Sequence, residues 1–346
     1  MVRNALFALL ALGPAAVVVD RATDASGLTL FILAAAALVP LAWLIGEATE
    51  HAARHTGPGI GGFLNATFGN APELIIALVA VDARLTEVVR GSLTGSVVGN
   101  LLLVLGFSLI FGGRGELDRG STLTSFALVS VAVLLFLVPA IPALDGDPDR
   151  RSLAVLSLPV SAVLLALYLV VTWVALRRHR RLHVSDVPDE IEAWSLPVAL
   201  AVLGVATAVT ALVAETLVHS LEAFAEELGL TDFFVAAVIV AIVGNAAEHG
   251  GAVVVAHRGQ LKLAAEIALA SSAQVAVFLI PAVALFSWAI HPLSLAFRPV
   301  ELGVVAGAVA VPALVLWGGR SSRLRGFLLV TAYGAAAAAF FLAGER

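Results

Sequence analysis

Long apolar runs, separated by short polar segments, follow one another along the chain. An α-helix needs roughly 17 to 25 predominantly apolar residues to cross the hydrocarbon core of a bilayer. Runs of this length predict eleven membrane-spanning helices, which lie at residues 4–20, 28–50, 60–82, 88–111, 123–143, 153–176, 195–217, 232–256, 262–288, 298–317 and 324–343. The chain is therefore predicted to be an all-α polytopic membrane protein.

The first apolar run follows Arg3, as the apolar part of a signal peptide would. The segment after it, from Asp20 to Ser26, is a poor match to an A-x-A cleavage site. We therefore expect an uncleaved first helix.

A short polar motif occurs twice within the predicted helices. Its copies are 175 residues apart (244 − 69 = 175), and they read Gly69-Asn70-Ala71-Pro72-Glu73 and Gly244-Asn245-Ala246-Ala247-Glu248. Each copy lies in the second helix of a five-helix unit. Because five is an odd number, the second unit enters the membrane from the opposite face. The sequence thus predicts an inverted repeat, which is typical of transporters with a site near the bilayer midplane.

The repeat divides the chain into four parts. We expect an N-terminal transmembrane helix at residues 1–24, a first five-helix repeat at 25–176, a linker at 177–194 and a second five-helix repeat at 195–346. Thirteen of the 20 lysine and arginine residues lie on the side of the N-terminus and seven on the opposite side. Since cytoplasmic loops retain these residues, the N-terminus and the linker are predicted to be cytoplasmic.

The composition agrees with a membrane protein. Of the 346 residues, 60% are hydrophobic and 13% are charged, whereas about a quarter of the residues of soluble domains are charged. Cysteine is absent, which excludes disulfides and thiolate metal sites. We expect the lipid bilayer as a partner and no nucleic acid, and the sequence predicts no particular oligomeric state.

Each residue type of the motif favours an interrupted helix. Glycine, here Gly69 and Gly244, permits a break or a close approach of the backbone. Asparagine is a strong N-cap, and a glutamate three positions later completes a capping box. Pro72 is compatible with the first turn of a restarted helix but not with a helix interior. The motif therefore predicts a discontinuous helix with unpaired backbone carbonyls.

Two glutamates at membrane depth, Glu73 and Glu248, indicate more than the capping of a kink. An ionised carboxylate in hydrocarbon costs several kcal/mol, and two at equivalent positions double that cost. Carboxylates, the amides of Asn70 and Asn245 and freed carbonyls match the six to eight oxygen ligands of Ca²⁺. Mg²⁺ and Mn²⁺ fit the same residue types. We predict a cation site formed by these four residues, with the glutamates as the metal ligands.

The helix after each motif carries further polar residues at matching positions. Four of them are expected to support the cation site, namely Ser96 and Asn100 in the first unit and Ser271 and Gln274 in the second. His249 directly follows Glu248 and is expected to tune its proton affinity. The alternative is that His249 bonds a neighbouring helix.

The two motifs resemble the paired repeats of the calcium/proton exchangers, a branch of the calcium/cation antiporter superfamily. The flanking segments Asn65-Ala66-Thr67-Phe68 and Ser271-Ser272-Ala273-Gln274 are also similar to that family, and Pro72 departs from its usual Thr or Val. The resemblance extends over nearly the whole chain. It implies a fold with one extra N-terminal helix and a 5 + 5 inverted repeat. It also implies that Glu73 and Glu248 bind Ca²⁺ and protons alternately, assisted by the asparagines and the polar residues of the following helices.

The function so implied is secondary active antiport of Ca²⁺ for H⁺ by alternating access, exporting Ca²⁺ across a prokaryotic plasma membrane. Ca²⁺ is then a transported substrate, and no cofactor is expected. Exchange coupled to Na⁺, or exchange of another divalent cation, is the main alternative. A channel suits an inverted repeat with competing carboxylates less well. An intramembrane metalloenzyme of the H-x-x-E-H type would need a histidine where Asn245 stands, so an enzyme is not expected.

Overall fold

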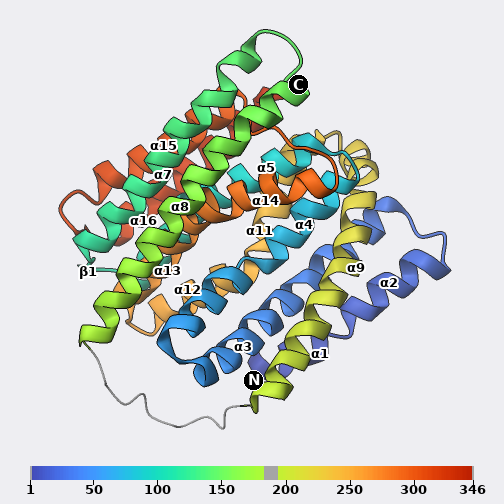
Figure 1. Cartoon of the computed structure of the whole chain (residues 1–346). Helices are drawn as coiled ribbons and strands as arrows, with labels where there is room; N and C mark the ends of the chain where they lie inside the picture. Colours follow the sequence, from blue (N-terminus) through green and yellow to red (C-terminus); the bar gives the residue numbers. More distant parts are fainter. Residues whose placement is uncertain (1, 183–193, 345–346) are drawn as a thin grey trace.

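Helices form almost the whole of the computed structural model, which describes residues 2–182 and 194–344 (Figure 1). In chain order the α-helices are α1 (Val2–Leu9), α2 (Leu12–Ala22), α3 (Gly27–Phe68), α4 (Ala71–Asp82), α5 (Thr86–Val98), α6 (Leu105–Gly112), α7 (Arg119–Ala140), α8 (Arg151–Leu182), α9 (Leu196–Leu228), α10 (Asp232–Phe234), α11 (Ala241–Gly244), α12 (Ala246–His257), α13 (Leu261–Gln274), α14 (Ile280–Phe286), α15 (Pro299–Val315) and α16 (Arg323–Ala343).

Short segments of other types complete the fold. They are the π-helical turns η1 (Gly99–Val104), η3 (Val235–Val240) and η4 (Val275–Leu279), the 3-10 turns η2 (Pro142–Leu144) and η5 (Ser287–Ala289), and the strands β1 (Gly115–Glu116) and β2 (Arg320–Ser321). The two strands pair antiparallel, with Gly115 opposite Ser321. They tie the connection before α7 to the connection before α16.

The helices account for the predicted membrane crossings as follows. In the described part of the chain, eight helical spans are long and apolar enough to cross a bilayer, and some of them join consecutive segments, as Thr86–Gly112 joins α5, η1 and α6. A ninth crossing results if the bent segment 232–257 counts as one. Two predicted crossings remain. The one at 60–82 covers the end of α3 and the 12-residue α4, and the one at 298–317 covers the 17-residue α15. The predicted linker at 177–194 lies mostly outside the described residues.

Helix α3 differs from the prediction. The apolar runs at 28–50 and 60–82 predicted two helices with a break between them, but α3 continues over 42 residues and the break lies at Gly69 and Asn70. The intervening polar segment stays helical, and within it Arg54 bonds Glu50 at 2.8 Å. Hydropathy indicates which residues lie within the membrane, but it does not indicate where a helix ends. The backbone hydrogen bonds of a helix can continue through a polar segment.

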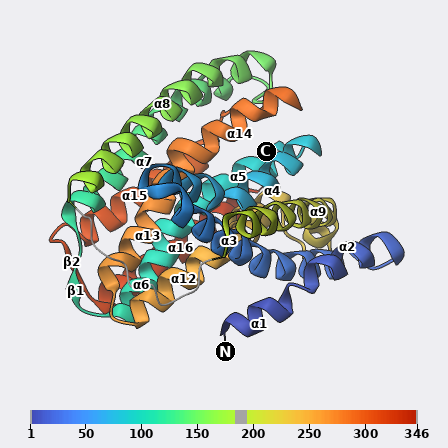
Figure 2. The same ribbon diagram turned by 60° about the horizontal axis from the view of Figure 1, so that its bottom comes forward.

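The helices that follow the two motifs are the innermost of the molecule. In their most apolar parts, 83% of the residues of span 86–112 and 72% of those of span 261–289 are buried, compared with 17% for α16. Figure 2 shows α7 and α8 on one side of the molecule and α2 on the opposite side. The polar residues that follow each motif are thus carried by the most deeply buried spans.

The two halves share unusual backbone features at equivalent positions. Helices α4 and α12 both have 12 residues, and each is followed by a residue with positive φ, Arg84 at 62° and Gly259 at 82°. These residues are 175 positions apart (259 − 84 = 175). The π-helical turns η1 and η4 also occupy equivalent places in the next span. Such agreement is expected of a duplicated five-helix unit.

Glycines bring the two halves into close contact. A Cβ atom at Gly95 of α5 would lie 2.0 Å from the carbonyl oxygen of Ala237 in η3, and one at Gly91 would lie 3.0 Å from that of Phe233. Backbones approach this closely only where a side chain is absent. Helix α5 therefore lies directly on the segment that precedes the second motif.

We expect Gly95→Ala to lower the midpoint of thermal unfolding of the detergent-purified protein, because the added methyl group forces α5 and η3 apart. Overpacking costs about 1–3 kcal/mol, and a clash with a backbone oxygen places this change at the upper end. Gly204→Ala in α9 is the matched control, since nothing lies within 4 Å of a Cβ atom there. An unchanged midpoint for Gly95→Ala would refute the close contact.

Candidate functional site

Both copies of the motif interrupt a helix. Asn70 has φ −99° and ψ 16°, and Asn245 has φ −93° and ψ 5°, so the two residues adopt nearly the same conformation. The carbonyl of each asparagine accepts a hydrogen bond from the helix that restarts, at 3.0 Å from Leu74 N and 2.9 Å from His249 N. At the second copy the two helical segments are bent by 57°. The predicted break is confirmed, and Pro72 lies in the first turn of α4 as expected.

The prediction that the asparagines cap the restarted helices is wrong. Neither side chain accepts a capping hydrogen bond, so neither motif forms a capping box with its glutamate. An N-cap residue usually has an extended backbone, whereas both asparagines lie close to helical values. Their amides are oriented toward other partners instead.

A hydrogen-bonded network connects the two halves at the level of the breaks. Asn245 Nδ2 donates to Ser96 Oγ and to Ala241 O, both at 2.9 Å. Asn100 Nδ2 donates to Asn245 Oδ1 at 3.4 Å and to Ser271 Oγ at 3.1 Å. Ser96 and Asn100 belong to the span after the first motif, and both bond residues of the second half. The predicted supporting residues therefore bridge the two repeats.

The span after the second motif anchors two further site residues. Ser271 Oγ donates to Glu248 Oε2 at 2.5 Å. Asn70 Nδ2 donates to Gln274 Oε1 at 3.2 Å, which joins the first motif to the second half. The structure thus joins Asn70 to Gln274, and it connects Ser96, Asn245, Asn100, Ser271 and Glu248 in one series of hydrogen bonds. That these residues hold a cation stays a prediction.

Glu73 reaches the same region from the first motif. Glu73 is buried, with 7% of its surface exposed. Its side chain lies against the second motif, because a Cβ atom added at Gly244 would be 3.3 Å from Glu73 Cγ. Gly244 therefore makes room for the opposite glutamate as well as lying at the break. The carboxyl group of Glu73 is thereby brought to the segment that carries Glu248, four residues after Gly244.

Glu73, which is buried, and Glu248, which is partly buried, differ from the other charges inside the described part of the protein. Arg90 is 1% exposed and pairs with Asp149 at 2.7 Å and Glu87 at 3.0 Å. Arg298 pairs with Glu301 at 3.5 Å. Within the described chain, by contrast, Glu73 and Glu248 have no ion pair with a basic side chain. A charge buried without a partner is strongly unfavourable, so the pair requires neutralisation by something other than a fixed residue.

A small cavity lies beside Glu73, where the halves meet. Its volume is about 10 Å³, and its lining includes Ser92 and Ser96 from the first half and Val240, Ala241 and Gly244 from the second. This is roughly the room that one water molecule needs. The described residues contain no group of three His, Cys, Asp or Glu side chains that could hold a metal. A cation here would therefore need amide, hydroxyl or carbonyl oxygens besides the two glutamates.

That His249 tunes the proton affinity of Glu248 stays a prediction. No hydrogen bond or ion pair joins the two side chains in the described structure, and His249 Nε2 is buried without a partner there. Consecutive helix residues point about 100° apart, and the imidazole lies near Gly99, where a Cβ atom would be 4.0 Å from its Cε1. His249 therefore faces the first half at the start of η1.

The sequence analysis missed the glycines that allow the halves to meet. Gly91, Gly95 and Gly99 recur at every fourth position, a spacing that lets transmembrane helices approach closely. This pattern is readable in the sequence. The apolar residues that line the cavity, such as Leu93 and Val240, carry no such signal because they resemble any other residue of an apolar run.

Comparison with known proteins places this architecture among ion exchangers. The family model described as "Sodium/calcium exchanger protein" matches residues 26–177 and 198–342. The chain is similar to the Ca(2+)/H(+) antiporter of Synechocystis sp., with 38% identity over 90% of this chain and 91% of that protein. It is also similar to the Ca(2+)/H(+) antiporter ChaA of Bacillus subtilis, with 36% identity over 97% and 98% of the two chains.

Solved structures show the same fold. The structure of native YfkE superposes with a TM-score of 0.83 at 34% identity, covering 97% of this chain and 99% of that one. The H+/Ca2+ exchanger CAX superposes with a TM-score of 0.74 at 16% identity, covering 99% and 92%. At that level of identity the second similarity concerns the fold alone.

We expect Ser96→Ala to lower the thermal stability of the purified protein by about 1 kcal/mol, since it leaves one N–H of Asn245 without its acceptor in a buried site. Ser108→Ala is the matched control on the same span. The Ser108 hydroxyl is fully buried and has no hydrogen-bond partner in the described structure, so its loss should be neutral. Equal unfolding midpoints for the two variants would contradict the network.

Proposed function

The chain belongs to the sodium/calcium exchanger protein family, and from this premise we propose that it is a secondary active antiporter exchanging Ca²⁺ for H⁺ across the membrane. The observation that carries the proposal is a pair of glutamates, Glu73 buried and Glu248 partly buried, without a basic partner in the described chain. They come from equivalent positions of the two halves and meet at one site. A neutralising species that enters and leaves is what such a pair requires.

Ca²⁺ is the transported substrate that the donor set fits. Glu73 and Glu248 supply two negative charges, which balance one divalent cation. The amide oxygens of Asn70 and Asn245 and nearby hydroxyls add the uncharged oxygen ligands that Ca²⁺ accepts in its six- to eight-fold coordination. Because Ser271 already bonds Glu248, it orients that carboxyl group toward the site. We do not propose His249 as a ligand, because its imidazole lies near Gly99 at the start of η1.

Protons and Ca²⁺ compete for the glutamates. Two ionised carboxylates in a poorly hydrated site are disfavoured by desolvation and by mutual repulsion, so protons occupy them when the cation leaves. A bound cation supplies the positive charge that replaces these protons. Occupancy by one species excludes the other, and two carboxyl groups provide for two protons per Ca²⁺. Exclusive occupancy at a single site is the basis of coupled exchange.

Alternating access follows from the arrangement of the halves. We propose that residues 25–176 and 195–346 form inverted five-helix repeats that rock against each other around the site, after an N-terminal helix at 1–24. The equivalent breaks at Asn70 and Asn245 and the side-chain network between the repeats support this. We further propose that the N-terminus is cytoplasmic in a prokaryotic plasma membrane. An inward proton gradient then drives Ca²⁺ export.

The alternatives are weaker for specific reasons. The Ca(2+)/H(+) antiporters among the similar proteins favour protons over Na⁺ as the coupling ion. A continuous pore suits an inverted repeat with two competing carboxylates less well than alternating access does. A zinc enzyme of the H-x-x-E-H type would need a histidine in place of Asn245, whose amide bonds Ser96 instead.

We expect Glu73→Gln and Glu248→Gln each to reduce proton-gradient-driven uptake of radioactive calcium into proteoliposomes to the level of protein-free vesicles. Glutamine keeps the size of the side chain but carries no charge and releases no proton. Glu226→Gln is the matched control, since Glu226 is exposed near the end of α9, and its uptake should equal that of the unaltered chain.

Correct folding of the glutamine variants is checked by their elution profile and unfolding midpoint. Substantial uptake by either variant would remove that glutamate from the mechanism. Uptake driven by a Na⁺ gradient and indifferent to pH would favour the Na⁺-coupled alternative.

The inverted topology predicts that Asp82 and His257 lie on opposite membrane faces. Both residues are exposed, and each ends the helix after its motif, 175 positions apart (257 − 82 = 175). Because the native chain has no cysteine, Asp82→Cys and His257→Cys introduce single thiols. A membrane-impermeant thiol reagent should label the first variant from outside and the second from the cytoplasmic side.

Inverted vesicles serve as the control, in which the labelling pattern should be exchanged. If both variants react from the same side, the two units are not inverted and the proposed topology is wrong.

A further inference from the structure

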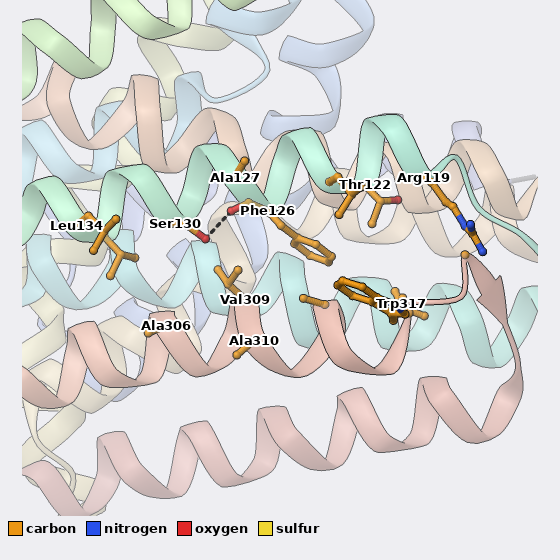
Figure 3. A pocket seen from close by; sticks show the side chains of 15 residues that line it. Arg119, Thr122, Phe126, Ala127, Ser130, Leu134, Ala306, Val309, Ala310 and Trp317 are labelled. Atoms are coloured by element: carbon orange, nitrogen blue, oxygen red, sulfur yellow. Dashed lines mark hydrogen bonds between the residues drawn. The ribbon is translucent and has the colours of Figure 1, made fainter.

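A long groove lies between α7 and α15, away from the glutamate site (Figure 3). Its volume is about 760 Å³, within the range of sites that hold organic ligands. Phe126 and Val309 form its floor, with 6% and 7% of their surfaces exposed, while Leu123, Leu134 and Trp317 lie along its edges with 59%, 63% and 79% exposed. The groove is therefore open along its length to the surroundings of the protein.

The chemistry of the lining is that of a hydrocarbon site. Apolar side chains make up most of it, and the hydroxyl of Ser130 is already bonded to Phe126 O at 2.8 Å (Figure 3). From Arg119 to Leu134 the groove follows sixteen residues of α7, a length of roughly 22 Å at the helical rise. This exceeds half of the roughly 30 Å hydrocarbon core. The groove is therefore long enough to hold one acyl chain of one leaflet, and its lining has the same polarity as such a chain.

One end of the groove is basic. Figure 3 shows Arg119 and Trp317 at this end. Arg119 donates to the carbonyl of Gly318 at 2.7 Å, and it forms no ion pair with a carboxylate of the described chain. Arg320 and Arg323 lie in the adjacent strand β2 and at the start of α16. Tryptophan and arginine are typical of the level of lipid headgroups.

The nearest acidic residue does not neutralise Arg119. Asp118 accepts a hydrogen bond from Ser121 N at 2.8 Å, as the cap of α7, and it pairs with Lys262 at 3.3 Å. The bond from Ser121 and then the bond from Lys262 lower the pKa of Asp118. Asp118 therefore stays ionised and committed to these partners, and Arg119 keeps its charge available for an anion.

We propose that this groove binds one anionic phospholipid, with an acyl chain between α7 and α15 and the phosphate at Arg119. An apolar groove long enough for one acyl chain, with a cationic end, selects this occupant. Helix α7 also packs against α13, and α15 packs against α5 and η1. These elements carry Ser271, Ser96 and Asn100, so a bound lipid supports the two innermost spans from outside.

The test uses the full-length protein in detergent, titrated with phosphatidylglycerol or phosphatidylcholine of identical acyl chains. Native mass spectrometry counts the bound lipid, and the thermal midpoint reports its effect on stability. We expect one phosphatidylglycerol to be retained in preference to phosphatidylcholine. Arg119→Gln should weaken phosphatidylglycerol binding about fivefold, the factor for about 1 kcal/mol per basic residue near a membrane surface.

Two further variants separate this site from general effects. Arg258→Gln removes an exposed arginine outside the groove and should leave lipid binding unchanged. Ala310→Phe fills the groove and should weaken binding of both lipids. Should Ala310→Phe fail to fold, the comparison of Arg119→Gln with Arg258→Gln decides.

Three results would overturn the proposal. One is equal phosphatidylglycerol binding by Arg119→Gln and the unaltered chain. A second is full stabilisation by glycerol phosphate without acyl chains, which would indicate a site for the anion alone. The third is that Ala310→Phe changes the number of chains per particle but leaves lipid binding unaltered. That result would indicate that the groove is an interface between copies of the chain.

Discussion

The cost of a carboxylate in an apolar interior is the constraint on which this structure depends. Glu73 and Glu248 are held among buried helices, and no described basic residue neutralises them. Arg90 in α5 shows the other solution, because it pairs with two carboxylates and its charge is balanced permanently. The charge of Arg90 is thus neutralised by fixed residues, whereas the proposed transport requires that the glutamates be neutralised by ions that exchange.

The same constraint explains why the two halves must touch so closely. A cation shared by two glutamates requires that both carboxyl groups reach one point, so the helices that carry them need a close interface. Gly95 lets α5 lie against η3, and Gly244 gives space to the side chain of Glu73. The Asn100–Asn245 contact then fixes the register of the halves at the level of the site. Site and interface are therefore one structure, and in the mechanism proposed above this is what couples ion occupancy to the relative position of the repeats.

The outer helices have a different physical task. Helices α7 and α15 pack on the inner spans with one face and meet lipid with the other. Between them they leave a groove that the protein's own side chains do not fill. Support of the inner spans thus depends partly on the bilayer. This is reasonable for a molecule whose halves must move, since a fluid lipid chain adapts to a changing groove better than a fixed side chain.

By itself the sequence determined the membrane class, the helical runs, the duplicated motif and the two glutamates. These follow from local composition and from spacing along the chain, because the hydrocarbon core requires long apolar helices and makes every buried charge conspicuous. The break at each asparagine was also predictable, since glycine, asparagine and proline act on their own backbone.

Only the tertiary structure decided which groups the site residues bond. The asparagines were expected to cap their own helices, but their side chains bond across the interface, and His249 faces η1 rather than Glu248. Side-chain partners depend on the rotation and approach of helices, which arise from packing between segments far apart in the sequence. For the same reason the continuity of α3 and the groove between α7 and α15 were not apparent from hydropathy, which averages over both faces of a helix.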